Sequence, residues 1–460
     1  MNQTISSLIS DKISSINFNA IPEQVRERAK YLIMDALGIA YASTQYDFAE
    51  KTLAGILAIS EPTPNGVPVI GMNVSLPARD AAIVNGLLIH GLDYDDTHPK
   101  GVIHATAPVL AAVLSQSHRL QKSGEDLLTA YMVGIEVATR LGAAAKGGFL
   151  QVGFHPTGLI GAFGATLAAA WLDKLDAGQM THAQGITLSL ASGSLEFLQD
   201  GAWTKRIHPG WAANAAITSA SLAKHGFLGP RETYEGRFGL YASHLGADFK
   251  LEGLEESIST IGQEWELMNI AVKPIPACHF THACTDAAAI IAKQFNLEDI
   301  LKIEAKVPAG VMKTVCEPAE NKQKPANSYE AQFSIPYSVA TGLRFGRFSL
   351  DALDEKAYTD PETLALAAKV ISVPDPDADF PRYYSGEVVV TLNDGKVISH
   401  REAINRGADV RPITNGEVEA KYVENTGNLL DAGKIAQISS ALKSLEKHSA
   451  NQLMNLLSTK

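Results

Sequence analysis

Residues 158–172, GLIGAFGATLAAAWL, decide the fold. In this apolar run of small side chains, Gly158, Gly161 and Gly164 recur at every third position. No strand precedes the run, so these glycines do not form the phosphate-binding loop of a dinucleotide fold. We expect them instead to allow close approach between helices. As the longest apolar run in the sequence, it is too short for a membrane span of about 20 residues.

The sequence on both sides of this run also has a helical pattern. After Pro22, apolar side chains recur at helical spacing, and segments rich in alanine and glycine continue to about residue 267. Helical periodicity returns from Thr414 to the end of the chain. These two parts predict one all-helical domain, formed by residues 1–268 and 401–460.

The texture between these parts is different. Residues 301–310 and 385–403 alternate in the manner of strands, and the second segment contains the hairpin sequence Asn393-Asp394-Gly395. Residues 337–343 and 361–371 read as helices. We therefore predict a mainly α protein in which residues 269–400 form an inserted, smaller α+β lid domain. A cleft between two such domains is a favoured place for a small-molecule site.

Composition narrows the classes of function. The chain has 460 residues, of which 46% are hydrophobic and 19% charged, as in a globular protein with a large core. Its net charge of −11 argues against nucleic acid or an anionic membrane as a partner. Three cysteines cannot all pair, and the N-terminus lacks the pattern of a signal peptide. We expect a cytoplasmic protein.

The most polar loop in this apolar setting is HGLDYDDTHPKGVIHATAPVL, residues 90–110. Its side chains can take up and donate protons near neutral pH. They are Asp93, Asp95, Asp96, Thr97, His90, His98, Lys100 and His104. Ordinary turn formation explains many such clusters equally well. The spacing does not fit an EF-hand, because His104 stands where that loop needs a glutamate. We predict a site for proton chemistry.

Four further segments carry polar groups. His155 precedes the glycine-spaced helix, where a helix cap is the simpler interpretation. Lys205, Arg206 and His208 precede another helix and predict either an anion site or a solvated basic turn. Tyr337 follows Pro336 at a helix start, and a core tyrosine is the plain interpretation there.

The remaining segment is KPIPACHFTHACTDA, which carries Lys273, Cys278, His279, His282 and Cys284. The two cysteines are six residues apart and no second pair follows, so we expect no metal. The protein as a whole is acidic, yet cationic and histidine side chains are concentrated in these polar segments. This distribution predicts a local positive pocket. A small polycarboxylate is its natural ligand, because cationic donors stabilise charge that develops next to a carboxylate. The sequence has no nucleotide, flavin or pyridoxal signature, so no cofactor is expected.

Taken together, these segments resemble the MmgE/PrpD family over nearly the whole chain. This family includes 2-methylcitrate dehydratases, cis-aconitate decarboxylases and an iminodisuccinate epimerase. The resemblance implies a helical domain with an inserted α+β lid and a homodimer. It places the catalytic positions of the family on Asp93, Thr97, His104, His155 and Lys205. Cys278, which is followed by His279, stands where mammalian-type decarboxylases have a histidine.

The leading hypothesis is a cofactor-independent lyase, a dehydratase or decarboxylase, acting on a small di- or tricarboxylate such as 2-methylcitrate or cis-aconitate. His104 or His155 would move the proton, and Asp93 would orient a histidine or lysine. The candidate substrate-binding residues are His208, Lys273, Cys278, His279, His282 and Tyr337. Two alternatives are a racemase or epimerase of an amino- or imino-dicarboxylate and a catalytically inactive carboxylate-binding protein.

Overall fold

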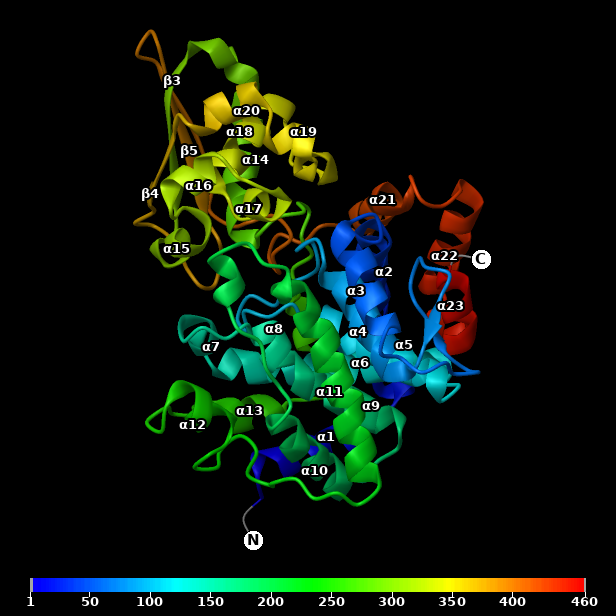
Figure 1. Ribbon diagram of the computed structural model, residues 1–460. Helices are drawn as coiled ribbons and strands as arrows, with labels where there is room; N and C mark the ends of the chain where they lie inside the picture. Colours follow the sequence, from blue (N-terminus) through cyan, green and yellow to red (C-terminus); the bar gives the residue numbers. More distant parts are fainter. Residues whose placement is uncertain (1–2, 459–460) are drawn as a thin grey trace. The chain divides into compact units, whose positions relative to one another are not determined.

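The computed structural model describes residues 3–458 and divides into two units. Unit 1 takes in the described residues up to Val272 together with those from Thr414 onward, and unit 2 is Lys273–Ile413 (Figure 1). The sequence predicted the boundaries at 269 and 400. Residues 401–413, predicted to belong to the helical domain, fall in unit 2, where Arg411 donates to the carbonyl of Ile404 at 2.8 Å and also pairs with Glu402.

Helices make up nearly all of unit 1, which agrees with the mainly α fold expected from the sequence. The N-terminal part contains α1 (Ile5–Ser14), α2 (Glu23–Ser43), α3 (Asp47–Leu57), α4 (Ala78–His90), α5 (Thr106–Arg119), α6 (Gly124–Ala144), α7 (Gly148–Gln151), α8 (Pro156–Leu159), α9 (Gly161–Leu172), α10 (Ala177–Leu188), α11 (Thr204–Lys224), α12 (Leu240–Leu245) and α13 (Leu254–Ser259). The C-terminal part contains α21 (Asn415–Thr426), α22 (Ala432–Lys443) and α23 (Ala450–Leu457).

The expectation of a purely helical domain was wrong in one detail. Strands β1 (Val67–Pro68) and β2 (Ser75–Leu76) pair antiparallel within unit 1. Each has only two residues, which is too short for alternation to reveal a strand in the sequence.

Helix α9 lies in the core of unit 1 against α5, α6 and α11. A methyl group at Gly164 would come within 2.4 Å of the carbonyl oxygen of Gly134 on α6, and one at Gly161 within 2.5 Å of Pro108 on α5. The close helix packing expected from these glycines is therefore confirmed. Helix α6 is long and apolar enough to cross a membrane, but 89% of its most apolar window is buried inside the structure. That burial is typical of a core helix.

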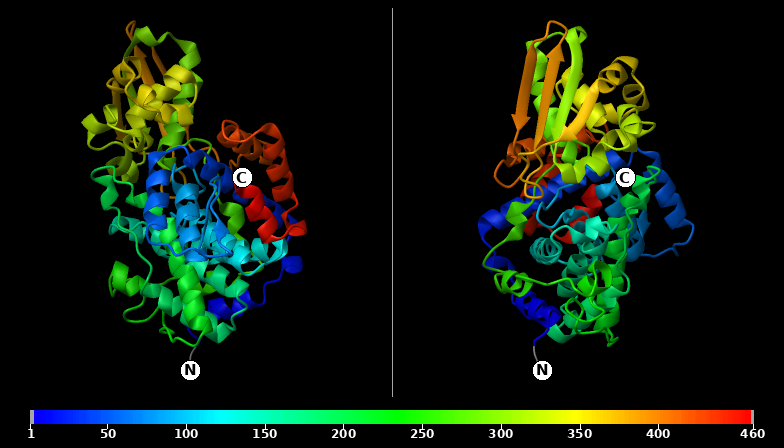
Figure 2. Two further views of the ribbon diagram at one scale, coloured as in Figure 1. Left: turned by 45° about the vertical axis from the view of Figure 1, so that its right-hand side comes forward. Right: turned by 90° about the vertical axis from the view of Figure 1, so that its left-hand side faces the viewer.

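Helix α21, from the C-terminal part of unit 1, packs on α2 from its N-terminal part (Figure 2). Lys421 makes the central contact. Its ammonium group lies 2.7 Å from the buried carboxylate of Asp35, donates to the carbonyl of Tyr94 at 3.0 Å and lies 3.6 Å from the centre of the Tyr94 ring. Lys421 thereby connects the loop after α4 to both α2 and α21.

Unit 2 is built on a sheet with the strand order β4-β3-β5-β6. Its strands are β3 (Ile300–Val307), β4 (Val370–Pro374), β5 (Gly386–Leu392) and β6 (Val397–Glu402). Its helices are α14 (His282–Ile291), α15 (Met312–Val315), α16 (Ala319–Gln323), α17 (Ser328–Gln332), α18 (Ile335–Phe345), α19 (Glu355–Tyr358) and α20 (Pro361–Ala367). Helix α14 packs on β5, β6 and α18.

The β5–β6 hairpin turns at Asn393-Asp394-Gly395, as expected, and Gly395 takes the positive φ of +86° that this turn requires. The helix expected at 361–371 was wrong at its end. Helix α20 stops at Ala367, and β4 begins at Val370 as a parallel partner of β3. Pairing with β3 determines that this segment forms a strand, and the local sequence pattern does not contain that information.

We expect Lys421→Met to lower the free energy of unfolding by about 3–5 kcal/mol, because it leaves the buried Asp35 carboxylate without its cation. Urea denaturation would measure the change. The control is Lys443→Met on α22, which removes a more exposed ion pair with Glu419 and should cost less than about 1 kcal/mol. Equal effects of the two substitutions would contradict a central role for Lys421.

Candidate active site

The loop between α4 and α5 holds Asp93 in an unusual backbone conformation. Its φ is +51°, in the left-handed region, which aspartate tolerates better than most residues. The Asp93 carboxylate is buried and accepts a hydrogen bond from Lys205 Nζ at 2.7 Å. Backbone strain of this kind persists only where the surroundings hold it, and it is concentrated at functional sites.

Helix α11 supplies the groups that hold this loop. Lys205, Arg206 and His208 lie inside its first turns, which corrects the expectation that they precede the helix. Arg206 Nε donates to the carbonyl of Gly91 at 2.8 Å, and its guanidinium lies 4.5 Å from the centre of the Phe48 ring. Arg206 therefore fixes the backbone of the loop.

His104 presents one ring nitrogen for proton transfer. Its Nδ1 lies 2.8 Å from the backbone carbonyl of Asp96, which can only accept a hydrogen bond, so Nδ1 carries the hydrogen. Nε2 is then the atom that gains or loses a proton. It lies 3.7 Å from the same Asp93 oxygen that binds Lys205. One oxygen of Asp93 thus connects His104 with Lys205.

His155 and His208 form a second pair, in which the two Nδ1 atoms are 3.0 Å apart. One must donate and the other accept, so at least one imidazole is neutral. Burial holds the pKa of His155 well below its usual value, with further contributions from His208 and Lys205. Burial likewise lowers the pKa of His208 to about 4. His155 occupies the N-cap position of α8, but its side chain makes no capping hydrogen bond, because Nδ1 faces His208 instead.

His90 and Asp95, members of the polar loop to which the sequence assigned no individual role, belong to the same cluster. Both side chains are fully buried, and His90 Nδ1 lies 2.8 Å from an Asp95 oxygen. The His90 ring lies 4.9 Å from that of His104 and stacks at 5.5 Å on that of His155. The available sequence signal was a histidine at the end of a helix, five residues before an aspartate.

His90, Asp95 and His104 also have the composition of a metal-binding set, with donor atoms within 4.8 Å of one another. Hydrogen bonds already explain their arrangement, because both Nδ1 atoms face oxygens of Asp95 or Asp96 at 2.8 Å. We therefore assign these residues to proton chemistry.

Two other acids of the loop region have structural roles. Asp96 binds Thr106 at the start of α5, and burial raises the pKa of this carboxyl to about 7. Glu266 lies 3.0 Å from His98 Nε2, and this hydrogen bond lowers the pKa of Glu266 to about 2. These contacts anchor the two sides of the loop.

Thr97, in the same loop as Asp93 and His104, has a buried hydroxyl. Its backbone exchanges two hydrogen bonds of 2.8 Å with Ala271, which fixes the residue. Its Oγ1 is buried and has no hydrogen-bond partner among the described residues 3–458. Buried hydroxyls are normally paired, so this atom is suited to a polar group of a ligand.

The remaining predicted site residues belong to unit 2, where Lys273 is buried. His279 Nε2 accepts from the amide of Asn405 at 2.8 Å, and its ring lies 4.6 Å from that of His282. His282 Nε2 donates to the carbonyl of Ala277 at 3.1 Å. The backbone N–H of Cys278 donates to a carbonyl, that of Gln332. A carboxylate-binding role for these residues stays a prediction.

Tyr337 occupies the core of unit 2. Its hydroxyl donates to the carbonyl of Ala352 at 2.7 Å, and its ring packs edge-on against Phe348. We therefore assign it to the core and leave it out of the proposed site, since its hydroxyl already has a structural partner.

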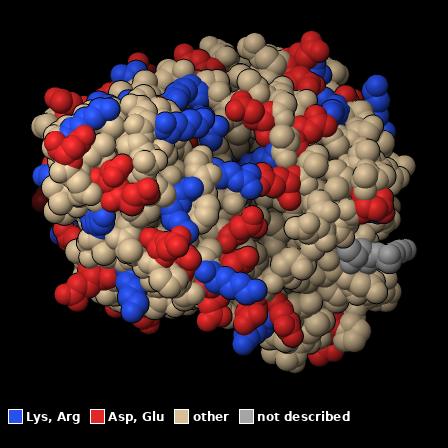
Figure 3. All heavy atoms as spheres, turned by 90° about the horizontal axis from the view of Figure 1, so that it is seen from above, with Lys and Arg blue, Asp and Glu red and all other residues tan. Residues whose placement is uncertain are grey.

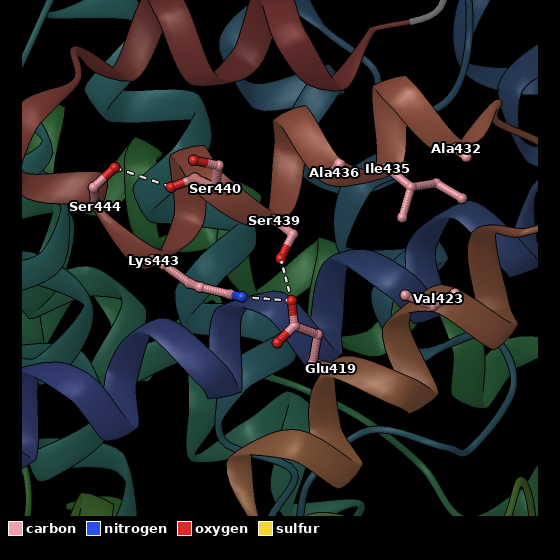
Figure 4. A pocket seen from close by; sticks show the side chains of 9 residues that line it. All are labelled: Glu419, Val423, Ala432, Ile435, Ala436, Ser439, Ser440, Lys443 and Ser444. Carbon is pink, nitrogen blue, oxygen red and sulfur yellow. Dashed lines mark hydrogen bonds and ion pairs between the residues drawn. The ribbon is translucent and has the colours of Figure 1, made fainter.

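A surface hollow of about 630 Å³ lies between α21 and α22 (Figure 4). Its charged and hydroxyl groups bind one another, since Ser439 and Lys443 both donate to Glu419. It contains none of the histidines described above.

On the face drawn in Figure 3, side chains of both charge signs are interspersed. The histidine cluster therefore remains the candidate active site.

The neutral histidine pair predicts a pH dependence of stability. The folded pKa of His208 is about 4 against an ordinary 6.5, so the unfolded chain binds its proton first as the pH falls. The free energy of unfolding should drop between pH 6.5 and 4, with this residue contributing up to about 1.4 kcal/mol per pH unit. Urea titrations at several pH values should show a shallower slope for His208→Gln. The exposed His225, at the end of the same helix, gives the control His225→Gln, which should keep the parent slope.

Comparison with known proteins places this sequence in a family. The MmgE/PrpD N-terminal domain matches residues 7–252, and the MmgE/PrpD C-terminal domain matches residues 275–447. Among the relatives, human cis-aconitate decarboxylase is 28% identical, covering 97% of this chain and 92% of the relative. The cis-aconitate decarboxylase-like protein oryM of Aspergillus oryzae is 26% identical, covering 97% of this chain and 95% of the relative. The 2-methylcitrate dehydratase of Escherichia coli K12 is 25% identical, covering 83% and 81% respectively. These relatives point to a lyase-type enzyme, and the chain belongs to the MmgE/PrpD family.

Proposed function

We propose that this protein is a cofactor-independent lyase that decarboxylates a small unsaturated tricarboxylate of the cis-aconitate type. The observation that carries the proposal is the set of His104 Nε2, Asp93 and Lys205, in which a partly exposed proton carrier lies beside a buried ion pair. The relatives named as cis-aconitate decarboxylases match nearly the full length of the chain, whereas those named as 2-methylcitrate dehydratases match 83% of it. Dehydration of 2-methylcitrate is the second candidate.

The chemistry follows from these groups. A Lys ammonium has three N–H donors, and we propose that Lys205 binds a substrate carboxylate as well as Asp93. When the carbon–carbon bond to the departing carboxylate breaks, carbon dioxide leaves and the electron pair enters the allylic system of the substrate. Protonated His104 then delivers its Nε2 proton to carbon, which gives the decarboxylated product and neutral His104. The Thr97 hydroxyl would position the substrate.

In the dehydration alternative, His104 first acts as a base, whereas in decarboxylation it acts as an acid. Neutral His104 takes the proton from the carbon next to a carboxylate, the carbon–oxygen bond breaks, and the hydroxyl leaves as water with the proton that His104 gives back. His155 and His208 keep the neighbouring wall of the site neutral near pH 7, because burial lowers the pKa of both. A neutral wall leaves the positive charge concentrated at Lys205.

The substrate can be tested by NMR in deuterated buffer with cis-aconitate, 2-methylcitrate, citrate and iminodisuccinate. We expect cis-aconitate to yield itaconate carrying one solvent deuterium on carbon, with no product from Lys205→Ala. Turnover should survive dialysis against a chelator. Deuterium exchange into iminodisuccinate without net product would instead indicate an epimerase. Saturable binding without exchange would indicate a binding protein.

We expect His104→Gln to lower turnover by about 10²–10⁴-fold, because glutamine cannot transfer the proton. The far-ultraviolet circular dichroism and the melting temperature should stay near those of the parent protein. The control is His182→Gln on α10, where Nδ1 of the histidine binds the carbonyl of Gly229. Near-parent turnover of His104→Gln with the product identified above would refute the assigned role.

A further inference from the structure

We infer that the buried pair of His90 and Asp95 positions His104 and stabilises its protonated form. This inference deepens the proposed function, because it rests on the role of His104 there as the proton carrier. Asp95 supplies the negative charge, and His90 orients the carboxylate that bears it. No contact with substrate is required of either residue.

The Asp95 carboxylate lies between two imidazole rings. One of its oxygens is 2.8 Å from His90 Nδ1, and the other is 3.5 Å from His104 Nδ1. The side chain of Asp95 is fully buried, so water screens this charge little. The nitrogen of His104 that carries a hydrogen in both protonation states therefore faces a carboxylate oxygen as well as the Asp96 carbonyl.

His90 acts as a neutral donor in this arrangement. Its Nε2 is buried and has no hydrogen-bond partner among residues 3–458. Protonation of His90 would place an N–H at that atom without an acceptor, which is unfavourable. The hydrogen of neutral His90 therefore resides on Nδ1 and points to Asp95. The negative charge of Asp95 then acts on His104.

The other ionisable groups around His104 do not replace Asp95. Asp93 lies 3.7 Å from Nε2, but Lys205 lies 2.7 Å from the same Asp93 oxygen and offsets its charge. The ring of His155 is 6.3 Å from that of His104, and burial keeps His155 neutral by lowering its pKa. The arrangement resembles the carboxylate behind the histidine of hydrolase triads, which stabilises the imidazolium that forms during reaction.

The test is a titration of His104 in the whole protein without substrate. Long-range ¹H–¹⁵N spectra of histidine-labelled protein follow each ring, and His104→Gln identifies the resonance. We expect Asp95→Asn to lower the midpoint of the His104 titration by about 1 pH unit or more, because the carboxylate favours the charged imidazole. An unchanged midpoint overturns the inference. The measurement needs no turnover, so failure of the proposed reaction would not affect it.

A matched control separates this charge from a general effect. Glu266→Gln removes a carboxylate that binds His98 in the same loop, and it should leave the His104 midpoint in place. If Asp95→Asn does not fold, Asp95→Ser removes the same charge and should give the same shift. A shift of similar size in Glu266→Gln would overturn the specific role of Asp95.

The part played by His90 has its own test once turnover is established. The amide of asparagine can donate to Asp95 in place of Nδ1, whereas leucine cannot. We expect His90→Asn to keep at least 10-fold more of the parent kcat than His90→Leu, with KM similar in the two variants. Equal losses of kcat would overturn the orienting role of His90.

Discussion

The ion pair between Asp93 and Lys205 is the constraint on which the site depends. It joins a residue with a left-handed backbone to the first turn of α11, in a place where both side chains are buried. A buried carboxylate without a cation would destabilise the folded protein strongly, so the ion pair fixes the position of the loop. Arg206, next to Lys205, fixes the same loop at Gly91. Two consecutive cationic residues of α11 therefore hold the loop: Lys205 binds the side chain of Asp93, and Arg206 binds the backbone carbonyl of Gly91.

Within this frame, the surroundings of each histidine set its role. His155 and His208 bind each other through equivalent nitrogens and lie in a buried region, so both stay neutral near pH 7. His104 lies near two carboxylates and is 14% exposed in its side chain, which suits a group that exchanges protons with a ligand. His90 is fully buried and serves as a donor. Chemically identical side chains thus take three different roles within one cluster.

The sequence predicted the helical fold and the grouping of Asp93, Thr97, His104, His155 and Lys205 around one polar loop, because spacing and the resemblance to the family both mark these positions. It did not predict the pairing of His90 with Asp95, since many aspartates near glycine and proline only form turns. The parallel strand β4 was also missed, and Tyr337 was proposed for the site although a core position was its plainer interpretation. Both depend on partners distant in sequence, β3 in one case and the carbonyl of Ala352 in the other.

The glycine run that decides the fold also shapes the site. Gly158 begins the three-residue spacing, and a methyl group there would come within 2.6 Å of the carbonyl oxygen of Ser192 and 3.0 Å of His208 Cβ. The first contact is with backbone and cannot easily relax. A side chain at position 158 would therefore push α8 away from the backbone of Ser192, and its 3.0 Å approach to His208 Cβ on α11 would disturb the 3.0 Å contact between His155 and His208. The feature that allows these helices to pack closely thus also keeps the neutral histidine pair together.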